Sequence, residues 1–190
     1  SPLPFGRGKK TVNADRYFSD PRTELTLQQW AVDDGPVEVR EADADHWICE
    51  ELHLQLLNPD TIIVAFNAPF ERRALKALGY DLPPERFVCT MALAYHFSYA
   101  GGLGEVCAQV GLPGEQHKLK EGNRVMLKFA KPRKPSASDP STRWTKLNAT
   151  ADWALFLEYG KQDVVASRAL WHWFVSKYGS PLTPDTVLHE

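Results

Sequence analysis

The stretch 61–71 constrains the fold of this chain more than any other part of the sequence. Residues 61–66 form a continuous β-branched and apolar run, which is typical of a strand buried on both faces, as in a parallel sheet. A helix is expected to follow at once, with Asn67 as its N-cap, Pro69 in its first turn and Gly79 just past its end. A strand that leads directly into a helix predicts an α/β domain.

The other segments fit the same fold class. Strands are expected at residues 25–32, 37–40 and 87–90, and helices at 45–57, near 91–99, at 104–110 and at 151–178. The first two strands flank Asp33-Asp34-Gly35-Pro36, a turn signal that joins them in a β-hairpin. Residues 1–11 and 132–143 have loop compositions. A chain of 190 residues is long enough for one domain that buries about 70% of its unfolded surface.

The last expected helix places a carboxylate among its apolar residues. At 100° per residue, one face is expected to pack on the sheet, and it holds Trp153, Phe156, Gly160, Val164, Ser167, Trp171 and Phe174. The opposite side holds Glu158, Lys161 and Arg168. Asp163 lies on the apolar side, where a carboxylate is costly to bury unless it is paired or binds a metal. Tyr159 lies one turn earlier, so the two side chains can share one space.

Asn67-Ala68-Pro69-Phe70-Glu71 follows the expected strand directly. Ligands of open α/β sheets bind outside the carboxyl ends of the strands, which is where this segment lies. Each of the candidate site residues also has a simpler interpretation, in which its role is structural. Glu71 is favourable at a helix N-terminus, Asp163 fits the edge of an apolar stripe or a cap of another element, and Tyr159 fits an ordinary helix edge.

The charge of the chain is distributed unevenly. Residues 117–146 hold nine Lys and Arg against two acids, a net +7, so the remainder carries −9 of the total of −2. This asymmetry predicts one basic face and a polyanionic partner. Cys49, Cys89 and Cys107 are far apart and form no CxxC pair, so we expect a reduced, cytoplasmic protein without a zinc site. No run approaches the roughly 18 apolar residues of a membrane span.

Together these residues resemble the tyrosine subgroup of the DEDD exonuclease superfamily. Asn67-Ala68-Pro69-Phe70-Glu71 matches the second motif of that family, with Glu where Asp is commoner, and Tyr159-Gly-Lys-Gln-Asp163 matches the third. The order of the motifs and their separation of about 90 residues also fit. The remaining likeness is to exonuclease domains of phage family A DNA polymerases, and it is carried by residues 31–35, 102–103, 117–118, 128–133 and 162–164.

The resemblance implies an RNase H-like fold, with a mixed central sheet flanked by helices, and a 3′–5′ proofreading exonuclease that acts on single-stranded DNA 3′ ends. The first motif, Asp-x-Glu on a central strand, has no match here, because Asp15, Asp20 and Glu24 lack a preceding apolar run. The chain begins with Ser1, and we expect a fragment or a processed chain that lacks this strand. Its activity and its metal binding are then expected to be weak.

In the complete family, four carboxylates hold two Mg²⁺ or Mn²⁺ ions about 3.5–4 Å apart around the scissile phosphate. The resemblance makes Asp163 a direct metal ligand, Glu71 a ligand of the second metal and Tyr159 the residue that orients the attacking water. The nucleic-acid contacts expected from the sequence are Asn67, Phe70, Lys118, Arg124, Lys128 and Arg133. Phe70 is expected to stack on the terminal bases and the cations to contact phosphates. The simpler interpretations are that Phe70 is a core residue and that Arg124, Lys128 and Arg133 belong to a solvated basic loop.

Three functions therefore remain open from the sequence. The first is an exonuclease that works in cis with a polymerase, in a bacterium or a phage-infected cell. The second is a nucleic-acid-binding module with the same fold and no hydrolytic activity. The third is a stand-alone exonuclease.

Overall fold

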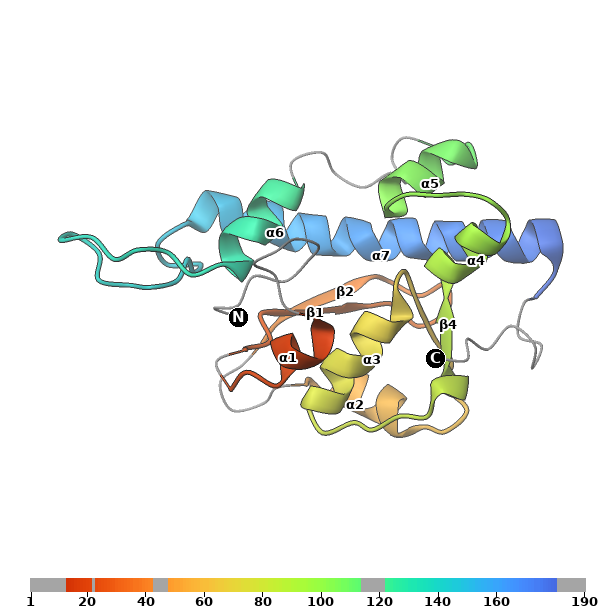
Figure 1. The fold of residues 1–190 in the computed structure, drawn as a ribbon, viewed down its shortest axis with the longest axis horizontal. Helices are drawn as coiled ribbons and strands as arrows, with labels where there is room; N and C mark the ends of the chain where they lie inside the picture. Colours follow the sequence, from red (N-terminus) through yellow and green to blue (C-terminus); the bar gives the residue numbers. More distant parts are fainter. Residues whose placement is uncertain (1–12, 22, 43–47, 114–121, 181–190) are drawn as a thin grey trace.

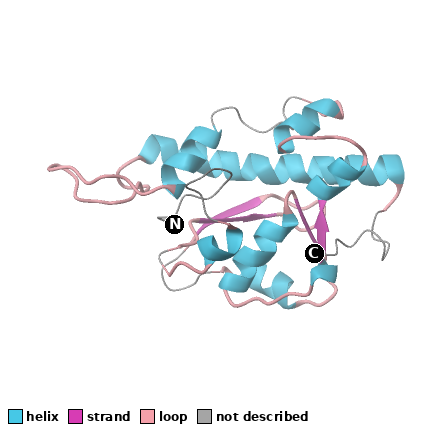
Figure 2. Cartoon of the chain, in the orientation of Figure 1, coloured by secondary structure: helices cyan, strands magenta, loops and turns pink. Residues whose placement is uncertain are grey.

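The computed structural model describes residues 13–21, 23–42, 48–113 and 122–180. One long helix, α7 (Thr150–Tyr178), runs along most of the molecule (Figures 1 and 2). The remaining helices are α1 (Ala14–Phe18), α2 (Glu50–Leu57), α3 (Ala68–Ala77), η1 (Pro84–Arg86), α4 (Thr90–His96), α5 (Leu103–Gln109) and α6 (Gly122–Ala130). The strands are β1 (Leu27–Trp30), β2 (Glu38–Glu41), β3 (Ile63–Ala65) and β4 (Phe87–Cys89). Helices α4, α5 and α6 and three of the strands contact α7, while α1 packs on α3 away from it. The mixed α/β class predicted from the sequence is confirmed.

The strands of the described residues form two separate two-stranded sheets. Strands β1 and β2 make the predicted hairpin, in antiparallel register from Leu27 opposite Glu41 to Trp30 opposite Glu38. Strands β3 and β4 pair in parallel, from Ile63 opposite Phe87 to Ala65 opposite Cys89. The sequence predicted a mixed central sheet that lacks its first strand, and the described residues form these two separate pairs of strands.

The strand predicted at residues 61–66 is shorter and less buried than expected. It spans three residues, and all three side chains are half-buried, because one of its edges pairs with β4 and no described strand pairs with the other. Arg86 fixes its beginning by donating hydrogen bonds to the carbonyl oxygens of Thr61 (3.0 Å) and Leu56 (2.8 Å). This places the end of β3, and the helix α3 that follows, at a defined position.

Three apolar clusters hold the helices in place. The largest joins α4, α5 and α7 and contains Leu93, Ala94, Leu103, Val106, Cys107, Ala166, Leu170 and Phe174. A second, with Ala68, Phe87 and Cys89, joins α3 to β3 and β4. The third joins α6 to the first half of α7 and contains Val125, Phe129 and Tyr159. The sequence did not predict α6 or α1.

The single packing face predicted for the last helix is only partly correct. The buried residues of α7 are Tyr159, Gly160, Ala166, Leu170 and Phe174, while Val164, Ser167 and Trp171 are half-buried. Arg168, expected on the outer side, donates to the carbonyl oxygens of Gly35 (2.6 Å) and Asp33 (3.3 Å) in the hairpin turn. The reason is that α7 contacts β1, β2, β3, α4, α5 and α6, so its neighbours surround it on several sides.

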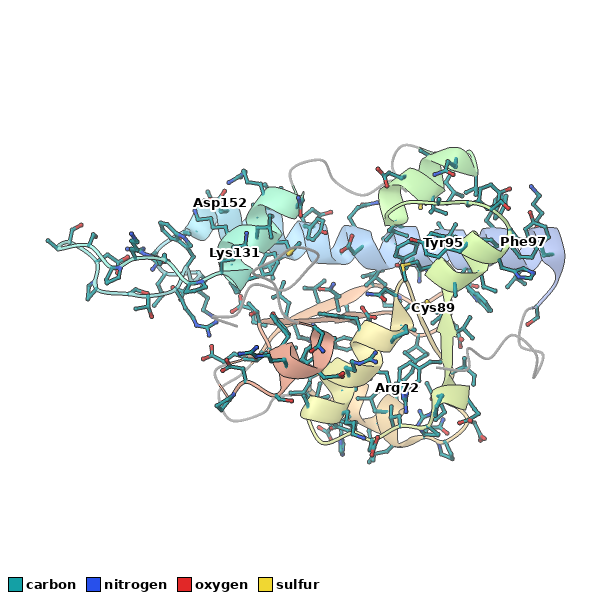
Figure 3. The ribbon with its side chains drawn as sticks, viewed as in Figure 1. Arg72, Cys89, Tyr95, Phe97, Lys131 and Asp152 are labelled. Atoms are coloured by element: carbon teal, nitrogen blue, oxygen red, sulfur yellow. The ribbon has the colours of Figure 1, made fainter. Side chains whose placement is uncertain are left out.

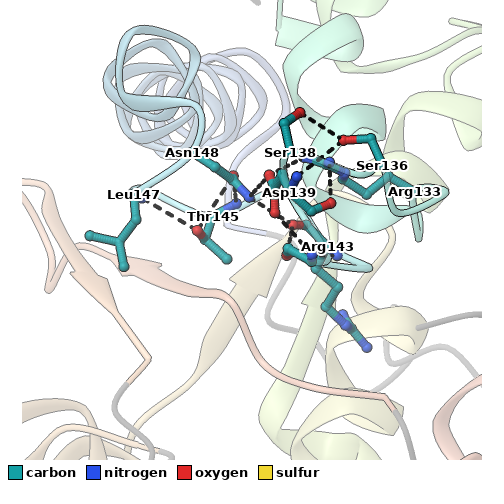
Figure 4. A network of polar contacts seen from close by, with 9 residues as sticks. Arg133, Ser136, Ser138, Asp139, Arg143, Thr145, Leu147 and Asn148 are labelled. Atoms are coloured by element: carbon teal, nitrogen blue, oxygen red, sulfur yellow. Dashed lines mark hydrogen bonds and ion pairs between the residues drawn. The ribbon is translucent and has the colours of Figure 1, made fainter.

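The segment between α6 and α7, residues 131–149, forms an arm that projects from the body of the molecule (Figure 1). A polar network holds it together, in which Arg133 donates to Asp139 (2.7 Å) and Asn148 donates to Asp139 and to the Arg143 carbonyl oxygen (Figure 4). The Trp144 ring is flanked by two cations, Lys128 at 4.2 Å and Arg133 at 4.3 Å from its centroid. The predicted loop is thus held by specific polar contacts. No helix in the described part of the chain is long and apolar enough to cross a membrane.

Candidate active site

Glu71 lies in the first turn of α3, directly after the end of β3, as the sequence predicted. Its Oε2 atom is shielded from solvent and accepts no hydrogen bond within the described part of the chain. Burial raises the pKa of Glu71 to about 7, a hydrogen bond from its own backbone N–H lowers it, and the charge of Asp163 raises it further. A buried carboxyl group with an unused oxygen is unfavourable in a purely structural role.

The arginines that follow Glu71 in the sequence are engaged elsewhere. Arg72 donates to the carbonyl oxygen of Leu82 (3.2 Å). Arg73 donates to Asp15 of α1 (2.9 Å) and to the carbonyl oxygen of Pro69 (3.0 Å). The sequence neighbours of Glu71 therefore fasten α3 to the surrounding chain.

The structure brings Asp163 of α7 near Glu71, although 92 positions separate them in the sequence. The effect of the Asp163 charge on the pKa of Glu71 requires the two carboxyl groups to lie a short distance apart. The Oδ1 atom of Asp163 is shielded from solvent as well. Two like charges held together in a buried place favour either a shared proton or a cation between them.

Gly160 allows α7 to approach the hairpin closely. A Cβ atom on Gly160 would lie 2.6 Å from Oε1 of Gln29 in β1, closer than real Cβ atoms come to other atoms. Helix α7 also contacts β3, the strand that leads to Glu71. Gly160 thus leaves room for the Gln29 side chain between α7 and the hairpin.

Tyr159 lies one helical turn before Asp163 and is buried, with 4% of its surface exposed. Its ring packs against Val125 and Phe129 of α6. Residues four apart on a helix lie on the same side, so the Tyr159 hydroxyl and the Asp163 carboxylate extend from neighbouring positions. The interpretation of Tyr159 as an ordinary helix-edge aromatic does not fit its burial.

Asn67 and Phe70, both predicted to contact DNA, lie at the start of α3. Asn67 occupies the N-cap position of α3, but its side chain makes no capping hydrogen bond. Its backbone is left-handed, with φ 73° and ψ 47°, a conformation in which asparagine is enriched. The Phe70 ring packs edge-on against Phe18 of α1, with centroids 4.9 Å apart, and near Tyr17 at 6.4 Å. These contacts favour the packing role of Phe70.

Three of the cations predicted to contact phosphates form ion pairs within the described residues. Asp152 lies at the start of α7 (Figure 3). Arg124 and Lys128 both contact it, and the hydrogen bonds from Arg124 and then Lys128 lower the pKa of Asp152 to about 2. Arg133 pairs with Asp139, and its side chain is only 12% exposed. Lys118 lies outside the described residues.

Two other lysines, Lys131 and Lys134, were not among the DNA contacts predicted from the sequence. Lys131 and Lys134 lie where α6 passes into the arm, are exposed and have no ion-pair or hydrogen-bond partner in the described ranges. Both belong to the basic stretch recognised in the sequence. Counting charges could not reveal which members would be paired, because the paired acids Asp139 and Asp152 lie in different elements.

Glu71 and Asp163 present oxygen donors that suit a hard divalent cation such as Mg²⁺ or Mn²⁺. The orphaned Oε2 of Glu71, the shielded Oδ1 of Asp163 and the repulsion between the two groups fit such an ion. Within the described ranges, no group of three or more His, Cys, Asp or Glu is placed to bind a metal. The described chain thus provides two carboxylates of the four expected from the resemblance.

The three cysteines are free thiols. Cys49 is half-buried, and Cys89 and Cys107 are buried.

Comparison with known proteins finds a relative among phage enzymes. The chain is 29% identical over 156 residues to a DNA polymerase of Bacillus phage SP02, a match that covers 81% of this chain and 24% of that protein. The chain thus spans about a quarter of the length of the relative. No family model matches the chain. No solved structure matches it either.

Proposed function

We propose that this chain is the 3′–5′ exonuclease module of a phage-type DNA polymerase and that it removes nucleotides from single-stranded DNA 3′ ends. The observation that carries the proposal is the nearness of Glu71 and Asp163, each with a carboxyl oxygen shielded from solvent, with Tyr159 one turn away from Asp163. The similarity to a phage DNA polymerase supports a polymerase domain in cis. Two neighbouring carboxyl groups with shielded oxygens are a costly arrangement, and phosphodiester hydrolysis with a divalent cation would account for it.

Glu71 and Asp163 are the residues that would hold the cation. A bound Mg²⁺ or Mn²⁺ supplies a water of lowered pKa and offsets the negative charge of the phosphate. Glu71 must lose its proton to act as a ligand, so its raised pKa makes cation binding stronger above pH 7 than below it. The Tyr159 hydroxyl orients the attacking water, since a buried phenol held by α6 keeps a fixed position.

The proposal includes an RNase H-like fold that the described residues complete only in part. Such a fold has one central sheet, whereas β1–β2 and β3–β4 are separate here. We propose that a further strand, carrying the Asp-x-Glu motif, belongs between β1 and β3. That strand would join the two sheets and add two carboxylates beside Glu71 and Asp163.

The experiment that tests the function is digestion of a 5′-labelled single-stranded oligonucleotide by the chain with Mn²⁺ or Mg²⁺. We expect a slow ladder of products shortened from the 3′ end, which disappears when EDTA removes the metal. A 3′-labelled copy should release its label as a mononucleotide from the first cleavage. Endonucleolytic products or release from the 5′ end would contradict the proposal.

A second candidate function is a binding module that performs no hydrolysis. It is favoured by the presence of only two carboxylates at the site within the described ranges. Oligonucleotide binding without any ladder, in the same assay and with both metals, would select it. A stand-alone exonuclease is distinguished from a polymerase module by the coding sequence downstream of Glu190.

The exposed lysines of the arm give a prediction on binding. The double variant Lys131→Ala/Lys134→Ala should bind single-stranded DNA several-fold more weakly, because these cations have no intramolecular partner in the described ranges. Each phosphate contact to a single strand contributes about 0.7 to the salt slope, so the slope of log K against log salt should fall by about 1.4. Fluorescence anisotropy at several salt concentrations measures both quantities.

The matched control removes two cations at other positions. Lys76 pairs with Asp81 at the end of α3, and Lys177 lies over the Trp173 ring near the end of α7. The variant Lys76→Ala/Lys177→Ala has the same net charge as the test variant. Equal loss of salt dependence in the two variants would show that the arm makes no specific phosphate contact.

A further inference from the structure

Gly122, the first residue of α6, lies against the ring of Tyr159 on α7. A Cβ atom on Gly122 would come within 2.7 Å of Cγ of that ring and would overlap Cδ2 and Cε2. Non-bonded carbon atoms pack at about 3.5–4.0 Å, so no side chain fits at this position while the ring stays in place. The Tyr159 ring therefore fills the space that a side chain at position 122 would take.

The backbone gives no other reason for a glycine at this position. The φ angle of Gly122 lies outside the left-handed region, so a residue with a side chain could adopt the same conformation. Glycine is also among the least favourable residues in a helix. The contact with the Tyr159 ring is the feature of the fold that requires it.

The packing around the Tyr159 ring fixes where its hydroxyl lies relative to the site. Val125 and Phe129 of α6 pack in one cluster with Tyr159, and Gly122 covers one side of the ring. A ring held in this way can move only together with α6. Because Tyr159 and Asp163 are one turn apart on α7, the ring position sets where the hydroxyl lies relative to the acid pair.

We infer that Gly122 is a positioning residue for Tyr159, and that α6 acts as the support that sets the place of the phenol hydroxyl. The catalytic meaning of this inference rests on the proposed function. The packing part does not, because it concerns the contact between Gly122 and the ring alone. A side chain at position 122 displaces the ring and with it the hydroxyl.

Thermal unfolding of four proteins tests the packing. The change Gly122→Ala should lower the Tm by several degrees in the wild-type background. In a Tyr159→Ala background the ring is gone, and the same change should leave the Tm unchanged or raise it, since alanine favours helix over glycine. An equal fall in both backgrounds would overturn the inference.

A spectroscopic measurement covers the case in which Tyr159→Ala does not fold. In protein labelled with 3-fluorotyrosine, the ¹⁹F resonance of Tyr159 is identified by its loss in Tyr159→Phe. We expect Gly122→Ala to shift this resonance, and Asn123→Ala, at the exposed neighbouring position of α6, to leave it in place. A Tyr159 resonance that Gly122→Ala leaves unchanged would also overturn the inference.

Kinetics test the catalytic part in the same digestion assay. Gly122→Ala should lower kcat about tenfold to a hundredfold with little change in KM, because the ring is misplaced while the surface that binds DNA is intact. In a Tyr159→Phe background the change should cost no further activity. Wild-type protein that binds DNA without cleaving it would refute the proposed function and the catalytic role together, while the Tm and ¹⁹F results decide the packing separately.

Discussion

Replacing Asp163 with Asn should reduce the metal-dependent digestion of a single-stranded oligonucleotide by about 1,000-fold or more. A metal ion that balances charge in the transition state contributes several kcal/mol, and each 1.36 kcal/mol is a factor of ten in rate. Asn keeps the size of the side chain but removes the charge that attracts the ion. The rate of appearance of the first shortened product, with Mn²⁺ in excess, measures the effect.

Glu158→Gln is the matched control for this prediction. Glu158 is an exposed acid on the same helix, five positions before Asp163, and its loss changes the net charge equally. We expect this variant to digest DNA at the wild-type rate. If Asp163→Asn retains more than a tenth of the wild-type rate, Asp163 is not a metal ligand and the proposed mechanism is wrong.

Replacing Glu71 with Gln should stabilise the metal-free protein at pH 8. The pKa of Glu71 is about 7 in the folded protein against an ordinary value of 4.5, so the folded state holds a proton that the unfolded chain releases between these values. The stability from this group is therefore fully present below pH 4.5 and is lost as the pH rises through 7. At pH 8 we therefore expect the free energy of unfolding of Glu71→Gln to exceed that of the wild type by about 3 kcal/mol. For a chain of this size, that corresponds to a Tm higher by roughly 6–12 °C.

The glutamine side chain of this variant resembles the protonated carboxyl group at every pH, so the variant should lose this pH dependence. Thermal unfolding in EDTA at pH 4.5 and pH 8 is the measurement, and the two proteins should differ little at the lower pH. Adding Mn²⁺ at pH 8 should raise the Tm of the wild type and leave that of Glu71→Gln almost unchanged. A variant less stable than the wild type at pH 8 without metal would show that the Glu71 carboxylate is a structural group.

Local patterns in the sequence predicted much of the secondary structure correctly. The hairpin signal at residues 33–36 gave β1 and β2, and the run that ends at Phe66 gave β3, α3 and the position of Glu71 at the strand end. These features depend on neighbouring residues, which a pattern can register. The long helix α7 was predicted for the same reason, with its first residue one position from the observed one.

The arrangement of the site depended on contacts between distant segments. The periodicity of α7 could not show which side faces α6 and which faces the sheets, so the burial of Tyr159 was underestimated. The sequence also could not show that Arg124 and Lys128 share Asp152 as an ion-pair partner, because 24 to 28 positions separate these cations from that acid. Gly122 gave no signal in the sequence, because its role depends on a ring 37 positions away.

The Glu71–Asp163 pair joins the start of one helix to the middle of another, and this makes the spacing along α7 part of the chemistry. Deleting a single residue between the Gly160 contact with β1 and Asp163 would rotate everything downstream by about 100° about the helix axis. Asp163 would then turn away from Glu71, while Tyr159, upstream of the deletion, would stay against α6. Relatives of this chain should therefore vary in the arm more freely than in the length of these few residues.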